Sequence, residues 1–128
     1  MLSLIGGSDI MQNKEMIKGN TELLVLKVLS EKDMHGYEMI KVIEAQSGRK
    51  FVIKAGTLYP VLHGLEEKGF IVGEWDESTG DRKRKIYKIT DVGETQLKHQ
   101  ELAWKEYSNT INSVLAGKKT SEDVVYGY

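Results

Sequence analysis

The spacing of apolar residues along the chain predicts three helices, then two strands, then one long final helix. Across residues 14–29, apolar side chains are frequent enough to bury much of a helix, although a Gly-Asn-Thr sequence ending at Thr21 interrupts the pattern. Because Thr21 is a residue type that caps helix starts, we expect either a kinked helix or two short ones. A turn over 31–36 separates this segment from a second helix expected over 37–46.

The third helix is expected between residues 56 and 69. Its apolar positions recur at intervals of three and four, as on one face of a helix: Leu58, Val61, Leu62 and Leu65. Pro60 is the only proline of the chain and is tolerated in a first helical turn, which places the start near Gly56 or Thr57. An ordinary amphipathic core helix would show the same periodicity, so the role of this segment depends on its neighbours.

The segments that surround the third helix are β-type. Residues 70–75 and 83–90 are typical of two strands, and the polar turn over 76–81 joins them into a hairpin. A shorter apolar run, 51–53, is either an edge strand or a buried connector. The predicted fold class is therefore mainly α with a small β-hairpin (α+β), in the order of a winged helix-turn-helix.

The final helix is expected over residues 92–115, after a capping threonine at Thr90. Two rows of side chains recur every seven residues along it: Leu97, Trp104 and Ile111, and beside them Gln100, Tyr107 and Val114. A long terminal helix on a small domain cannot bury a tryptophan and a tyrosine by itself. We therefore expect it to pair with the same helix of a second copy, forming a homodimer.

Composition narrows the classes of function. The chain has 128 residues, a net charge of −1, 40% hydrophobic residues and no cysteine. Its three histidines form no metal-ligand pattern, and no nucleophile motif or phosphate-binding glycine loop is present, so neither a metal, a cofactor nor an enzyme is expected. Residues 1–11 lack the features of a signal peptide, and no apolar run is long enough to cross a bilayer. The expected location is the cytoplasm.

Two groups of polar residues suit DNA. The start of the third helix carries Lys54, Thr57, Tyr59 and His63, which can neutralise or hydrogen-bond phosphates and base edges in a major groove. The return strand of the hairpin begins with four consecutive basic residues: Arg82, Lys83, Arg84 and Lys85. Such a run also serves simply as a solvated edge that prevents strands from aggregating. Its position directly after a candidate recognition helix favours a wing that contacts the DNA backbone or minor groove.

Short motifs then point to a known family. They are His35-Gly36-Tyr37-Glu38-Met39, Gly56-Thr57-Leu58-Tyr59-Pro60, Glu66-Glu67-Lys68-Gly69 and the wing residues Gly80, Arg82, Arg84, Lys85 and Tyr87. On these motifs the chain resembles the PadR family of transcriptional regulators over about residues 14–115. The resemblance implies a winged-helix homodimer that represses a promoter, and it places Tyr37, Thr57, Tyr59 and the wing arginines at positions where family members contact DNA.

Within that family the chain is similar to short members with a tryptophan in the last helix, a position that Trp104 matches. In multidrug-responsive members this tryptophan flanks a flat pocket for aromatic compounds at the dimer interface. The resemblance places five further residues at that pocket: Met16, Leu23, Tyr107, Ser108 and Ile111. The alternative is that Trp104 only packs the dimer, with Tyr107 filling the space that a ligand would need.

These observations give one interpretation and one alternative. The sequence predicts a flexible N-terminus over 1–11, a winged helix-turn-helix over 12–90, a dimerisation helix over 91–117 and a flexible tail over 118–128. The expected function is a homodimeric repressor that binds a double-stranded DNA operator and responds to a small planar aromatic ligand. The alternative is a winged-helix module for protein interaction that has no ligand response.

Overall fold

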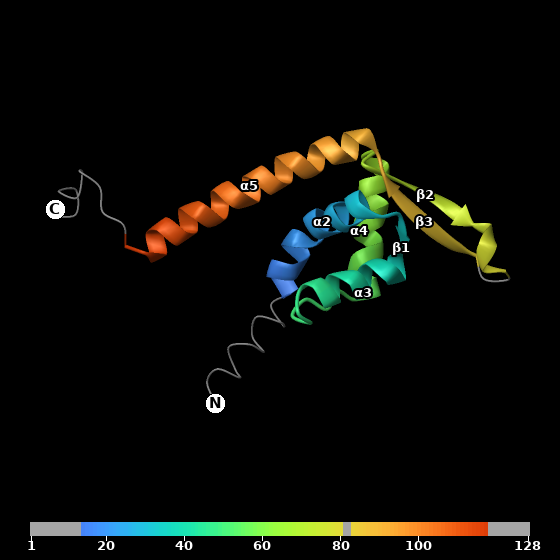
Figure 1. The fold of residues 1–128 in the computed structure, drawn as a ribbon, viewed down its shortest axis with the longest axis horizontal. Coiled ribbons are helices and arrows are strands. Elements are labelled where there is room, and N and C mark those ends of the chain that lie inside the picture. Colours follow the sequence, from blue (N-terminus) through green and yellow to red (C-terminus); the bar gives the residue numbers. More distant parts are fainter. Residues whose placement is uncertain (1–13, 81–82, 118–128) are drawn as a thin grey trace, which may run out of the picture. The chain divides into compact units, whose positions relative to one another are not determined.

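The computed structural model describes residues 14–80 and 83–117. They divide into two compact units, one ending at Leu97 and one beginning at Lys98. The elements are α2 (Lys14–Glu31), β1 (Met34–His35), α3 (Gly36–Gln46), α4 (Ala55–Glu67), β2 (Ile71–Asp76), the short 3-10 helix η1 (Glu77–Thr79), β3 (Arg84–Ile89) and α5 (Asp91–Leu115) (Figure 1). The flexible ends that we predict over 1–11 and 118–128 lie outside the described residues.

Helix α2 is one continuous helix from Lys14 to Glu31, so the alternative of two short helices divided near Thr21 is wrong. Thr21 does not cap a helix start, because it lies in the middle of α2 with a fully buried side chain. Val25, Leu26 and Leu29 follow it on the buried side of the helix. The burial of that side outweighs the weak helix propensity of the Gly-Asn-Thr sequence, since tertiary packing supplies most helical stability.

The first unit contains a sheet of three strands in the order β1-β3-β2, one strand more than we expect from the sequence. β2 and β3 form the predicted antiparallel hairpin, with register from Ile71 opposite Ile89 to Asp76 opposite Arg84. The additional strand, β1, lies in the segment expected to be a turn, and it pairs with β3 through Met34 and His35. Two residues are too few to show strand periodicity, which explains why the sequence pattern does not reveal β1.

One hydrophobic core joins α2, α3 and α4 to the inner side of the sheet. Fourteen residues form it: Val25, Leu26, Val28, Leu29, Met34, Met39, Ile43, Ile53, Leu58, Leu62, Leu65, Ile71, Tyr87 and Leu97. The run 51–53 is a buried connector rather than a strand, with Ile53 only 2% exposed. The hairpin of β2 and β3 extends from this core as a wing (Figure 1).

Helix α4 begins at Ala55, slightly before the expected start. The N–H groups of Thr57 and Leu58 both donate to the carbonyl of Lys54, at 2.9 Å each. Pro60 consequently lies in the second turn rather than the first. It has no N–H to donate to the carbonyl of Gly56, so α4 lacks one internal hydrogen bond on an exposed side of its beginning.

Thr90 joins three elements and confirms the predicted cap. Its hydroxyl accepts a hydrogen bond from the N–H of Gly93 at 3.0 Å, which satisfies the first turn of α5. The same hydroxyl lies 2.7 Å from the carbonyl oxygen of Gly69 and 3.1 Å from that of Phe70, the two residues before β2. Gly93 packs directly on this junction, because a Cβ there would lie 2.0 Å from the Phe70 carbonyl oxygen.

Candidate nucleic-acid interface

Helix α4 has one buried face and one exposed face. Leu58, Leu62 and Leu65 are at most 1% exposed and fix the helix to the core. The predicted DNA-contacting residues lie elsewhere on its circumference: Lys54 is exposed at the N-cap position, Thr57 is half-buried, Tyr59 is 46% exposed and His63 is exposed. Such a helix can present its beginning to a groove while its apolar side remains packed.

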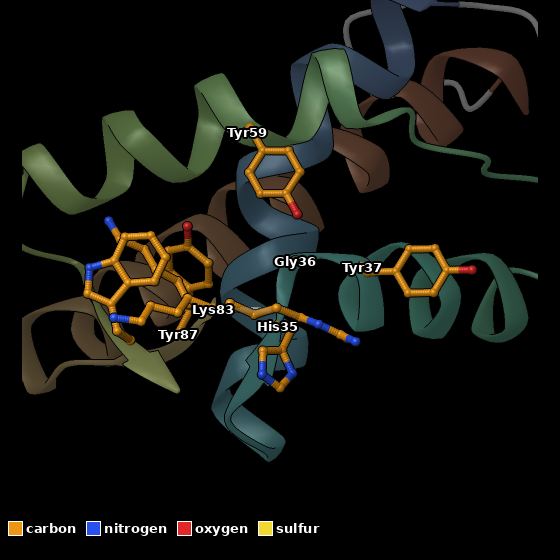
Figure 2. Close-up of a pocket in the computed structure, with 9 residues that line it drawn as sticks. His35, Gly36, Tyr37, Tyr59, Lys83 and Tyr87 are labelled. Carbon is orange, nitrogen blue, oxygen red and sulfur yellow. The ribbon is translucent and has the colours of Figure 1, made fainter. Parts of the chain in front are cut away.

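The position of Tyr59 depends on a glycine of another helix. The Tyr59 ring leans from α4 toward the start of α3, with its hydroxyl directed at Gly36 (Figure 2). A Cβ at Gly36 would lie 2.6 Å from the Tyr59 hydroxyl oxygen and 2.8 Å from the ring carbon that carries it. The absence of a side chain at Gly36 therefore makes room for the tyrosine, a relation that the sequence pattern does not indicate.

Tyr37 follows Gly36, and in Figure 2 its ring lies to the right of Tyr59 and His35, on the side of α3. It is 59% exposed, and the Nζ atom of Lys41 lies 4.9 Å from the centre of its ring. This cation–π contact brings the positive charge of Lys41 next to the Tyr37 phenol at the beginning of α3. The pair is suited to a phosphate, although the sequence interpretation includes Tyr37 alone.

The basic residues of the wing differ in their exposure and in their contacts. Lys83 and Arg84 are exposed, whereas Lys85 is half-buried. The Nζ atom of Lys85 lies 3.7 Å from Glu66 Oε2 of α4 and 5.6 Å from the ring centre of Trp75. Lys85 thus holds β3 against α4 as well as contributing charge. Arg82 lies outside the described residues.

A cavity of about 280 Å³ lies where the wing meets the starts of α3 and α4 (Figure 2). Its lining combines aromatic and basic side chains: His35, Gly36, Tyr37, Tyr59, Trp75, Lys83, Arg84, Lys85 and Tyr87. Five of these residues are among the nine DNA-contacting residues that we predict from the sequence, so the fold brings a good part of that set together. Lys54, Thr57 and His63 do not line the cavity.

Trp75 is a member of this group that sequence reasoning missed. It is 59% exposed on β2, opposite Lys85 of β3. An aromatic residue on the strand before a basic run was the available signal, because the cross-strand pairing of a hairpin places such residues side by side. Exposed aromatic rings next to cations are common where proteins hold a nucleic-acid strand.

A polar network holds the outer side of the wing. His35 Nε2 lies 2.9 Å from Asp76 Oδ2, and Asp76 also accepts hydrogen bonds from Ser78. Hydrogen bonds from the Ser78 hydroxyl and N–H, and then from His35, lower the pKa of Asp76. Burial raises the pKa of Glu38, but its hydrogen bonds with Lys32 and with the His35 N–H outweigh burial and leave that pKa lowered.

The residues predicted for a ligand pocket belong to two parts of the chain. Leu23 packs against the core of the first unit, and Met16 also lies on α2. On α5 in the second unit, the rings of Trp104 and Tyr107 have centroids 6.0 Å apart and are tilted by 36°. Trp104, Tyr107 and Ile111 are 46%, 62% and 41% exposed, and the Ser108 hydroxyl donates to the Lys105 carbonyl at 3.2 Å.

Neither a metal site nor a membrane span is found among residues 14–80 and 83–117. In those ranges no three acidic, histidine or cysteine side chains are grouped to hold an ion. No helix of the same ranges combines the length and apolar character needed to cross a bilayer.

The helix order, the packed α4 and the basic hairpin together define a winged helix-turn-helix DNA-binding protein. A family model described as "Transcriptional regulator PadR-like family" matches residues 25–99. The chain therefore belongs to the PadR-like family of transcriptional regulators, which confirms the resemblance seen in the sequence. It is a DNA-binding regulator of transcription and not an enzyme.

Relatives of known sequence or structure agree with this assignment. An uncharacterised protein of Lysinibacillus sphaericus is 32% identical over 107 residues, covering 84% of this chain and 98% of that protein. A transcriptional regulator of Mycobacterium tuberculosis is 28% identical over 98 residues, covering 77% of this chain and 88% of its own. The structure of a transcriptional regulator from Clostridium thermocellum is similar with a TM-score of 0.71 at 32% identity, covering 77% of this chain and 93% of that one.

Proposed function

We propose that the chain acts as a homodimeric repressor in which α4 is the recognition helix and the β2–β3 hairpin is the wing. In this proposal residues 12–90 form the DNA-binding part and residues 91–117 the dimerisation helix. The observation that carries it is the joint exposure of Tyr59 on α4 and of Lys83 and Arg84 on the wing around one cavity. The net charge of −1 is no obstacle, because the local distribution of charge decides where an anionic strand is attracted.

The proposed contacts fall into two kinds. The half-buried Thr57 and the exposed His63 of α4 are proposed to reach base edges or phosphates in the major groove. Tyr37, Tyr59, Lys83, Arg84 and Lys85 surround the cavity and are suited to the sugar-phosphate backbone. Lys54, exposed at the beginning of α4, and Arg82 complete the proposed set. Backbone contacts position the protein, while the α4 contacts supply sequence discrimination.

Salt dependence and substitution test the wing. In gel-shift experiments with the DNA upstream of its own gene, we expect the wild type to bind and the double variant Lys83→Ala, Arg84→Ala to bind much more weakly. The slope of log K against log salt should become shallower by about 0.9 for each phosphate contact that is lost. The matched control is Lys98→Ala, Lys105→Ala, which removes the same charge from exposed positions of α5. Equal slopes for the two double variants would refute the wing assignment.

The second unit supports the dimer. Tyr107, Ile111, Val114 and Leu115 are large apolar residues of α5 that are between 41% and 78% exposed, as is Trp104 at 46%. A second copy that covered this stripe would remove it from water, with a gain of about 25 cal/mol for each Å² of apolar surface. In sedimentation experiments Ile111→Glu should therefore produce monomers. Leu102→Glu is the matched control, because Leu102 is exposed about 200° away from Trp104 on the same helix.

The most specific part of the proposal is that a small ligand modulates operator binding. The exposed pair of Trp104 and Tyr107 supplies two rings on which a planar aromatic molecule could stack at the dimer interface. In a Trp75→Phe background, Trp104 is the only tryptophan, and planar aromatic cations should quench its fluorescence and weaken operator binding. Quenching without any change in DNA affinity would mean that the site binds dyes but does not regulate. No quenching would leave Trp104 as dimer packing.

A further inference from the structure

The side chain of His35 connects two strands that do not touch each other in the sheet. His35 is in β1 and Asp76 in β2, and β3 lies between these two outer strands. In the register, His35 is opposite Ile86 of β3, while Asp76 is opposite Arg84. The 2.9 Å contact from His35 Nε2 to Asp76 Oδ2 thus crosses the middle strand and fastens the far strand to the start of α3.

The Asp76 end of this contact reaches into the turn of the wing. Asp76 Oδ1 accepts a hydrogen bond from the Ser78 N–H at 3.0 Å and another from the Ser78 hydroxyl at 2.6 Å. Both His35 and Asp76 have side chains only 19% exposed, so water screens their interaction weakly. A movement of His35 would therefore displace Asp76 and, through Ser78, the short helix η1 that precedes β3.

The opposite side of the imidazole faces α3. Glu38 Oε1 accepts a hydrogen bond from the His35 N–H at 3.4 Å and lies 3.6 Å from His35 Nδ1. Glu38 is itself paired with Lys32, at 3.2 Å. Three basic residues of the wing line the cavity that His35 also borders: Lys83, Arg84 and Lys85. The imidazole thus lies between two carboxylates, those of Asp76 and Glu38.

We propose that His35 is a positioning residue for DNA binding, which sets the place of the wing relative to α3 and α4 by holding Asp76 across β3. The proposal rests on the proposed function, because it assumes that the wing contacts DNA. His35 itself needs no contact with the operator. A charged imidazole between two carboxylates should hold the wing more firmly than a neutral one, since a hydrogen bond between ionised partners is about twice as strong.

If His35 acts in this way, operator affinity should depend on pH through His35. Imidazole ordinarily changes its charge between about pH 5 and pH 8, whereas Asp76 stays ionised over that range. The chain has three histidines, so the experiment uses a His63→Gln, His99→Gln background in which His35 is the only one. In this background operator affinity should rise by about fivefold from about pH 8 to about pH 6, since the charge roughly doubles the strength of the contact.

Two substitutions separate positioning from folding. In the same background His35→Gln keeps a hydrogen-bonding side chain, and it should bind within about threefold of the parent at about pH 8 but gain nothing on acidification. Asp76→Asn should lose the pH response in the same way, while thermal melting shows that both variants are folded. A pH response in either variant equal to that of the parent would overturn the proposal.

A measurement without DNA keeps the test independent of the proposed function. Trp75 precedes Asp76 on β2, so in a Trp104→Phe variant of that background its fluorescence reports on the wing alone. We expect the fluorescence to change between about pH 8 and about pH 6, and this change should be absent after His35→Gln. An unchanged transition in His35→Gln would overturn the role of His35, whatever the DNA results. If that background shows the fluorescence change but the wild type binds no operator, the proposed function is overturned instead.

Discussion

The substitution Gly36→Ala should weaken DNA binding while leaving the fold almost as stable as before. An added Cβ would lie 2.6 Å from the Tyr59 hydroxyl oxygen, where ordinary contacts begin at 3.4 Å, so that oxygen must move by at least 0.8 Å. The backbone of Gly36 is not in the left-handed conformation, so alanine fits its dihedral angles. Tyr59 is 46% exposed and can turn away without unpacking the core.

The magnitudes follow from these contacts. Gly36 is the first residue of α3, where alanine gains less over glycine than the roughly 1 kcal/mol of a helix interior, so this gain offsets only part of the packing lost when Tyr59 moves. The melting temperature should therefore change by no more than about 5 °C, since about 1 kcal/mol shifts it by 4–8 °C in a domain of this size. Loss of one tyrosine hydrogen bond to a charged phosphate should cost about 1.5–3 kcal/mol, or roughly a ten- to 150-fold loss of affinity at each half-site.

The assay is fluorescence anisotropy with a labelled operator, combined with thermal melting of the same samples. Gly19→Ala is the matched control, because Gly19 lies in α2 with nothing within 4 Å of an added Cβ. It should raise stability by up to about 1 kcal/mol and leave DNA affinity unchanged. The decisive comparison is Gly36→Ala in a Tyr59→Ala background. A further loss of affinity there as large as in the wild type would refute the reasoning, because no tyrosine remains to be displaced.

Three further predictions concern stability. Gly93→Ala should destabilise the protein by about 2–3 kcal/mol, because the added Cβ would lie 2.0 Å from the Phe70 carbonyl oxygen, a backbone atom that cannot move by a rotamer change. Equal melting temperatures of Gly93→Ala and the wild type would contradict this. Thr90→Ala should cost about 1–2 kcal/mol in urea unfolding, since it removes the cap of Gly93, and Thr90→Ser should recover most of the loss. Pro60→Ala should raise the melting temperature, because an N–H becomes available to the Gly56 carbonyl; a lower value would show that the ring contributes packing.

The sequence predicted the elements that carry a long periodic signal. The apolar spacing of α4 and α5, the alternation of β3 and the cap at Thr90 depend on neighbouring residues, and the structure agrees with each of them. The sequence left open whether α2 is one helix or two, because the burial of Thr21 in the middle of the helix is a tertiary effect that local propensity does not contain. The strand β1 was missed for a related reason, since two residues become a strand only through their partner, β3.

The candidate site was predicted in its residue types and not in its geometry. Exposed basic and hydroxyl side chains can be found in a sequence, and most of the proposed DNA contacts come from that reading. The fit of Tyr59 over Gly36 and the contact between His35 and Asp76 join residues from different elements. The latter two are 41 positions apart, and only the register of the three strands brings them together. Trp75 was likewise overlooked, because its importance comes from Lys85 on the facing strand.

The tight fit of Gly93 against Phe70 limits how this regulator can transmit a signal. The first turn of α5 is fastened to the end of α4 by the Thr90 hydroxyl and leaves no space at Gly93 for sliding. If the protein is a dimer, the spacing between its two recognition helices must then change through the part of α5 that follows Leu97, by bending or by a new crossing angle. In such a dimer an inducer would change the part of α5 after Leu97, while the first turn of α5 stays fixed to the DNA-binding domain. If a ligand modulates operator binding, mutations that uncouple the two should therefore concentrate in the part of α5 after Leu97.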